Sequence, residues 1–129
     1  MKQQGIDWRS LGGLVAVVVV VWAVSAWARH ANEQTLGVHL AARARPGDIE
    51  MLSSTTCAVC KRAREWFTRH RVPFAECFVE TDAQCAQRFA ALGGVGTPTF
   101  VVRGQRIVGF DRERMVAALG GLEASSPRR

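Results

Sequence analysis

The fold is decided by residues 49–60, which read IEMLSSTTCAVC. A short segment with strand character comes first, a polar turn follows, and two cysteines then open a segment with helical periodicity. The apolar residues of that segment share one helix face: Val59, Ala63, Trp66 and Phe67. We therefore expect a strand over residues 49–52 that passes through a tight loop into a helix over residues 57–70.

Strand and helix patterns alternate along the chain that follows. Residues 83–92 and the segment after Asp111 have helical character, and Thr81 or Asp82 can cap the first of these helices. Three further segments have strand character: residues 74–79, 99–102 and 105–108. The order β-α-β-α-β-β-α predicts an α/β fold in which helices pack on the faces of a four-stranded mixed sheet.

The chain of 129 residues has room for one folded domain of modest size. We place this domain at residues 47–122, after a polar tether over residues 29–46 that is partly helical at most, and before a tail over residues 123–129. The domain carries ten Lys and Arg residues against eight Asp and Glu residues, so most of the formal charge of +6 lies outside it. No basic stripe alternates with aromatic residues, which excludes a nucleic-acid interface. We expect a monomeric domain.

An uncharged apolar segment precedes the tether. Leu11–Ala28 contains no charged residue, and a helix of that length spans about 27 Å, close to the thickness of a bilayer core. Trp8 and Trp27 would then lie near the two membrane interfaces. We interpret residues 1–28 as a targeting segment whose span, residues 11–28, is a retained membrane anchor.

Two alternatives stay open for this segment. Lys2 and Arg9 before an apolar stretch that ends in AWA, residues 26–28, also fit a cleaved signal peptide. A buried core helix is the third interpretation. The basic residues beside the span slightly favour a cytoplasmic N-terminus and an exported domain. The expected location is a bacterial inner membrane with an exported domain, or the periplasm after cleavage.

Cys57 and Cys60 lie where the first strand gives way to a helix, and this location suits a reactive thiol. A thiolate at a helix N-terminus faces unpaired N–H groups and the positive end of the helix dipole, which lowers its pKa. Positive charge in the first turns adds to this effect, from Lys61, Arg62 and Arg64. The first cysteine can attack a disulfide, and the second, one turn away, can resolve the mixed disulfide. A buried pair or a metal-binding pair is the structural alternative.

A second signal is residues 96–99, which read GTPT and precede the third strand. A proline there is compatible with a cis peptide, although an isolated turn proline is usually trans. Together with residues 53–63 (SSTTCAVCKRA) and 108–111 (VGFD), this stretch resembles the glutaredoxin family of the thioredoxin superfamily. The resemblance covers residues 48–120. It implies a thioredoxin-like, glutaredoxin-type fold with a cis-proline loop.

The resemblance also implies a binding groove. Thr97 would offer its backbone to a bound thiol peptide beside Pro98, and Asp111, after Gly109, would hold an end group of glutathione. Glutathione is therefore a candidate co-substrate, and no bound cofactor or metal is expected. The chain departs from the common family pattern at four positions: Ser54, Ala58, Val59 and Arg112. An equally open alternative is that the chain is a reductase or an oxidase of protein disulfides with the same fold.

The two other cysteines, Cys77 and Cys85, match no family motif. They need no function as small buried hydrophobic residues; a disulfide between them and a four-cysteine metal site are the alternatives. An exported domain with a small core would gain from a second disulfide, so we expect the two to lie close enough to bond. The three histidines, at positions 30, 39 and 70, are expected to be solvated.

The sequence therefore predicts a membrane-tethered or exported thiol–disulfide oxidoreductase that works through Cys57, Cys60 and a mixed-disulfide intermediate. Its substrate would be a protein disulfide or glutathione. Two other classes stay open: a module that binds an iron–sulfur cluster with glutathione, and a redox-inert scaffold of the same fold.

Overall fold

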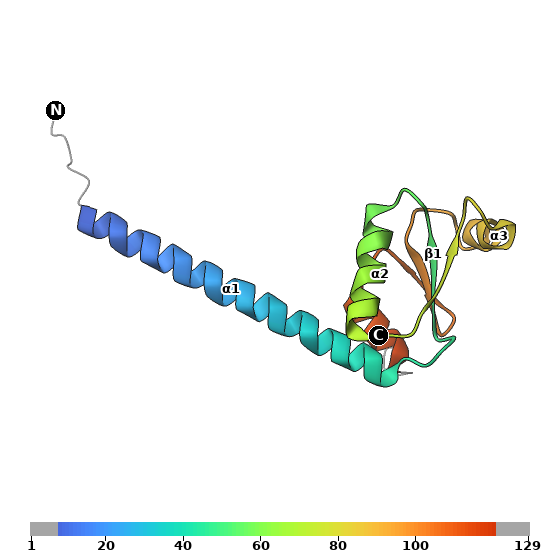
Figure 1. Ribbon diagram of the computed structural model, residues 1–129, viewed down its shortest axis with the longest axis horizontal. Coiled ribbons are helices and arrows are strands. Elements are labelled where there is room, and N and C mark those ends of the chain that lie inside the picture. Colours follow the sequence, from blue (N-terminus) through green and yellow to red (C-terminus); the bar gives the residue numbers. More distant parts are fainter. Residues whose placement is uncertain (1–7, 121–129) are drawn as a thin grey trace, which may run out of the picture. The chain divides into compact units, whose positions relative to one another are not determined.

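The structure is a computed structural model that describes residues 8–120 of the chain (Figure 1). Its elements are α1 (Trp8–Arg43), β1 (Ile49–Ser53), α2 (Ala58–His70), β2 (Ala75–Phe78), α3 (Ala83–Ala91), β3 (Thr99–Val102), β4 (Gln105–Val108) and α4 (Arg112–Leu119). The predicted order of strands and helices in the domain is confirmed. The first residues of the targeting segment and the expected tail, residues 123–129, lie outside the described residues.

The four strands form one mixed sheet in the order β2-β1-β3-β4. β1 pairs in parallel with β2 and antiparallel with β3, and β3 pairs antiparallel with β4. Leu52, near the end of β1, lies opposite Thr99 at the start of β3. The loop that leaves β1 and the loop that enters β3 are therefore neighbours, and both carry predicted site residues.

The main hydrophobic core lies on the face of the sheet covered by α2 and α4. Met51 of β1 and Phe67 of α2 are fully buried in it. The Phe67 ring lies 4.9, 5.8 and 5.6 Å, centroid to centroid, from the rings of Phe74, Phe100 and Phe110. Such aromatic pairs contribute about 0.5–1.5 kcal/mol each beyond the area that they bury. This packing fixes α2 against the sheet and so determines where α2 begins.

The opposite face of the sheet is covered by α3 (Figure 1). Leu52 points away from Met51 because side chains alternate along a strand, and it is fully buried, as is nearly all of Cys85 of α3. Glu50, on the same side of β1, forms an ion pair with Arg88 of α3. One strand thus holds helices on both of its faces.

The described residues 8–34 form a compact unit by themselves, the N-terminal part of α1. The side chains of residues 17–21, all valine, are each 56–61% exposed. Among the described residues, α1 is the one helix that is long and apolar enough to cross a membrane, with a mean hydropathy of 2.3 over eighteen residues. Both a membrane anchor and a signal sequence have this composition.

The sequence predicts a polar tether over residues 29–46 that is partly helical at most. This prediction is wrong for most of the segment, because α1 continues through it to Arg43. Leu36, Leu40 and Ala44 recur every fourth residue and so form one apolar stripe. Leu40 is fully buried in the main core, Ala44 is buried beside it, and Leu36 packs against it. The second compact unit accordingly begins at Thr35. The last turns of α1 belong to the folded domain.

A glycine lets this part of α1 lie close to α2. A Cβ atom placed on Gly37 would lie 2.2 Å from Nδ1 of His70. The His70 ring in turn packs on Trp66, with ring centroids 4.4 Å apart. His70, expected to be solvated, is therefore partly buried, because it fills the space between α1 and Trp66.

We predict that Gly37→Ala destabilises the domain, because the added methyl group overlaps the imidazole of His70. Overpacking costs about 1–3 kcal/mol, and the better helix propensity of alanine offsets at most about 1 kcal/mol of that cost. Thermal unfolding of the full chain in detergent micelles measures the net loss. Gly37→Ala should cost less in a His70→Ala background. An equal loss in both backgrounds would contradict the proposed contact.

Candidate active site

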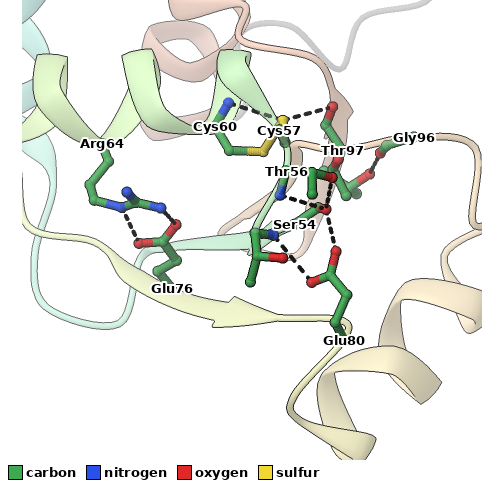
Figure 2. Close-up of a disulfide and its surroundings, with 11 residues drawn as sticks. Ser54, Thr56, Cys57, Cys60, Arg64, Glu76, Glu80, Gly96 and Thr97 are labelled. Atoms are coloured by element: carbon green, nitrogen blue, oxygen red, sulfur yellow. Dashed lines mark hydrogen bonds and ion pairs between the residues drawn. A yellow bond between two sulfur atoms is a disulfide. The ribbon is translucent and has the colours of Figure 1, made fainter.

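Cys57 is the N-cap residue of α2, with extended backbone angles of φ −85° and ψ 107°. Its Sγ accepts a hydrogen bond from the backbone N–H of Cys60 at 3.1 Å and forms a disulfide with the Cys60 sulfur (Figure 2). An N-cap acceptor satisfies a helix N–H group that would otherwise be unpaired. The same N–H and the helix dipole are positioned to stabilise a thiolate at Cys57 once the disulfide is reduced.

The two sulfurs differ in accessibility. Cys57 is partly exposed, whereas Cys60 is fully buried. Cys57 is therefore the more accessible residue of the pair, and Cys60 is shielded from solvent. This asymmetry favours the roles that the sequence predicts, attack by Cys57 and resolution by Cys60.

The basic residues of α2 are placed differently from one another. Lys61 and Arg62 are exposed, whereas the Arg64 guanidinium makes two hydrogen bonds of 2.7 Å to the carboxylate of Glu76 (Figure 2). These hydrogen bonds raise the pKa of Arg64 above its ordinary value. Because Glu76 balances its charge, Arg64 adds less positive potential near Cys57 than the sequence suggested.

The proline loop meets the cysteine pair directly. The Thr97–Pro98 peptide is cis, as the resemblance implied. The carbonyl oxygen of Thr97 lies 3.5 Å from Sγ of Cys57, although the two residues are forty positions apart (Figure 2). The hydroxyl of Thr99 donates to the carbonyl of Gly96 at 2.7 Å, which closes the loop. Thr97 thus presents its backbone beside the sulfur of Cys57.

Gly109 belongs to the same assembly. Its backbone N–H donates to the carbonyl of Pro98 at 2.9 Å, and its φ of +83° lies in the left-handed region that favours glycine. A continuous series of contacts therefore joins four of the predicted positions to one another: Cys57 to Thr97, Thr97 to Pro98, and Pro98 to Gly109.

Asp111 lies two residues further on, at the start of α4. It is the N-cap residue of this helix, and its carboxylate accepts a hydrogen bond from the backbone N–H of Arg114 at 3.0 Å. A cavity of about 290 Å³ is lined by residues 110–113, and the Arg112 guanidinium lies 5.4 Å from the centroid of the Phe110 ring. Within residues 8–120, none of the contacts described for Asp111 reaches Cys57 or Thr97. Its role toward glutathione stays a prediction.

Glu80 contacts the loop that leads into Cys57 and was missed by sequence reasoning. Its carboxylate accepts hydrogen bonds from the hydroxyl of Ser54 and, at 3.2 Å, from the backbone N–H of Thr55 (Figure 2). The Ser54 hydrogen bond holds the pKa of Glu80 below its ordinary value. No local pattern pairs residues that are 25 and 26 positions apart, so the sequence contained no signal for this contact.

The remaining cysteines are paired with each other. Cys77 of β2 and Cys85 of α3 form a disulfide with their Cα atoms 5.9 Å apart. The expected proximity is therefore confirmed, and all four cysteines of the chain are in disulfides. Cys85 is buried and Cys77 partly buried, so this second disulfide is less accessible at its α3 end.

Comparison with known proteins identifies the domain. The Glutaredoxin family model matches residues 49–107. This domain belongs to the glutaredoxin family. The match includes Cys57, Cys60 and the cis-proline loop and stops just before Gly109, so the family assignment is independent of Asp111 and α4.

Two solved structures show the same fold as this glutaredoxin-family domain. A mutant of the thioredoxin-like protein BC3987 is 27% identical, with 57% of this chain and 96% of that chain covered and a TM-score of 0.52. Methanoredoxin of Methanosarcina acetivorans is 25% identical, with 62% of this chain and 92% of that chain covered and a TM-score of 0.50. No curated protein matches the chain.

We predict that removing the second disulfide lowers stability. It closes a loop of about nine residues, and a cross-link of that span is worth about 2–3 kcal/mol through the entropy of the unfolded chain. The variant Cys77→Ser/Cys85→Ser should therefore unfold at a lower temperature than the oxidised wild-type chain. Mass spectrometry after thiol trapping should recover the Cys77 and Cys85 peptides linked. Free thiols at both positions would contradict the pairing.

Proposed function

We propose that the chain is a membrane-tethered thiol–disulfide oxidoreductase that works through the Cys57–Cys60 dithiol. The observation that carries this proposal is the position of Cys57. Cys57 is partly exposed, and its sulfur accepts the N–H of Cys60 and lies 3.5 Å from the Thr97 carbonyl. The family assignment and the similarity to a methanoredoxin support thiol redox chemistry of this kind.

The reaction transfers two electrons. In the reducing direction, the Cys57 thiolate attacks one sulfur of a substrate disulfide, and the other substrate sulfur leaves as a thiolate. The Cys60 thiolate then attacks Cys57 Sγ in the mixed disulfide and releases the second substrate sulfur. The substrate gains two electrons and becomes a dithiol, and Cys57 and Cys60 become a disulfide. The reverse sequence oxidises a substrate dithiol.

The Thr97 backbone supports binding of an extended thiol peptide. Its carbonyl lies beside Cys57 Sγ and is placed to accept a hydrogen bond from the backbone of a substrate bound at that sulfur. We propose glutathione or a protein disulfide as the partner. Asp111 and the N–H groups that start α4 would hold a glutathione end group, and the cavity over residues 110–113 supports that position.

Single cysteine replacements test the proposed mechanism. Cys57→Ser should reduce insulin disulfides no faster than the uncatalysed reaction, because the attacking sulfur is absent. Cys60→Ser should still attack and should accumulate a mixed disulfide that mass spectrometry locates at Cys57, because no second sulfur resolves it. A Cys57→Ser chain as active as the wild type, with an inactive Cys60→Ser chain, would reverse the two roles.

We further propose that α1 anchors the chain in a bacterial inner membrane and that the domain is exported. The exposed apolar surface of residues 17–21 supports an anchor, and the second disulfide suits an oxidising compartment. An exported domain would receive electrons through the membrane or act as an oxidant.

A reporter fused after Arg129 tests the orientation. If the domain is exported, alkaline phosphatase at this position should be active, because this enzyme folds only after export. Green fluorescent protein at the same position should be dark, because it does not become fluorescent when it is exported in unfolded form. An active phosphatase that stays with the membrane fraction supports an anchor, and one released in soluble form supports a cleaved signal. The opposite pattern of reporter activity would place the domain in the cytoplasm and favour a glutathione-linked reductase.

A further inference from the structure

The turn that leads into Cys57 is closed by a small network of hydrogen bonds. The backbone N–H of Cys57 donates to the carbonyl of Ser54 at 3.2 Å, and the N–H of Thr56 donates to the Ser54 hydroxyl at 3.4 Å. The Ser54 hydroxyl donates in turn to Glu80, and the N–H of Thr55 donates to the other Glu80 oxygen. One carboxylate from outside the turn over residues 54–57 therefore accepts hydrogen bonds from two of its residues.

Glu80 is itself held from two directions. It follows Val79, whose N–H donates to the carbonyl of Ser53 at 3.0 Å and extends the pairing of β2 with β1 by one bond. It also lies inside the segment that the Cys77–Cys85 disulfide closes, with Cα atoms 5.9 Å apart. The cross-link limits the conformations open to this segment, so the Glu80 carboxylate is positioned before a substrate arrives.

We propose that Glu80 is a positioning residue for Cys57, an inference that rests on the function proposed above. Glu80 holds the turn over residues 54–57 in the conformation that places Cys57 at the N-cap of α2. In that position Sγ accepts the N–H of Cys60, which stabilises the thiolate. The Cys77–Cys85 disulfide acts through Glu80, because it keeps the carboxylate at the turn. The second disulfide thereby influences the reactivity of the first cysteine pair.

The test measures the pH at which the rate of alkylation of Cys57 reaches half of its maximum. Full-length chains that carry Cys60→Ser are used in detergent micelles, because Cys57 is then a free thiol while Cys77–Cys85 stays oxidised. The rate of alkylation by iodoacetamide at Cys57 is followed against pH, with the modified peptide quantified by mass spectrometry. Glu80→Gln keeps the size of the side chain but leaves one acceptor oxygen for two donors.

The matched control is Glu50→Gln. Glu50 forms an ion pair with Arg88 of α3. The control therefore also removes one carboxylate, but the contact that it loses lies between the sheet and α3 and the turn stays untouched. Glu80→Gln should move the alkylation midpoint upward by about one pH unit, which lowers the thiolate fraction about tenfold at a pH below the midpoint. Glu50→Gln should leave the midpoint unchanged. Equal midpoints in the two variants, with similar losses in unfolding temperature, would show a merely structural role and overturn the proposal.

Two further variants keep the test decisive if Glu80→Gln folds poorly. Ser54→Ala removes the donor of the hydrogen bond that Glu80 accepts, so it should also move the alkylation midpoint upward. The double variant Ser54→Ala/Glu80→Gln should have a midpoint close to that of either single variant. Additive shifts would overturn the network. Cys77→Ser/Cys85→Ser should also raise the midpoint, and an unchanged midpoint would refute the part assigned to the cross-link.

The outcome is separable from that of the proposed function. If the chain with all its cysteines fails to reduce insulin while Glu80→Gln still moves the midpoint, the oxidoreductase activity is wrong and the positioning role stands. If insulin reduction depends on Cys57 while the midpoint stays fixed in Glu80→Gln and Ser54→Ala, the positioning role alone is refuted.

Discussion

The hydrogen bond from the backbone N–H of Cys60 to the sulfur of Cys57 places strict demands on the surrounding structure. It forms only if α2 begins at Ala58 and if Cys57 keeps an extended backbone just outside the helix. The first demand is met by the core, where Phe67 fixes α2 against the sheet. The second is met by the turn over residues 54–57. A helix start and a loop conformation thus together determine the position of the Cys57 sulfur.

The sheet supplies the other half of the site through its register. Because β1 and β3 are antiparallel neighbours and Leu52 lies opposite Thr99, the chain leaves β1 toward Cys57 at the same end where it enters β3 from Thr97. Cys57 and Thr97 are forty positions apart, and the residues between them form β2 of the sheet and the helices α2 and α3, which cover its two faces. The site is therefore a consequence of strand pairing, and no extra segment is needed to build it.

The parts of this structure that the sequence could predict depend on local patterns. The helix that starts at Cys57, the cap at Asp111 and the strand over residues 99–102 each follow from a window of about ten residues, where periodicity and capping preferences are informative. The cis-proline loop needed the family resemblance, because proline alone favours a trans peptide.

The parts that could not be predicted are single long-range contacts. They join segments that are polar or that lack a clear hydrophobic periodicity. Leu40 belongs to an apolar stripe of three residues, Leu36, Leu40 and Ala44, and a stripe of this length was too short to identify as core. Glu80 is one exposed carboxylate among several, and only the pairing of β2 with β1 brings it to Ser54. The identity of such partners is set by the three-dimensional fold rather than by neighbours in the chain.

The burial of Leu40 has a consequence for how the chain can be divided. A fully buried leucine is worth about 1.5–3 kcal/mol, a large share of the stability of a domain of this size. A recombinant fragment that starts at residue 47, where the sequence pattern alone puts the domain boundary, would lack this side chain and leave a hole in the main core. A fragment that starts upstream of Thr35 keeps it. Signal cleavage after Ala28 would also leave Leu40 in place, so processing and an intact core are compatible.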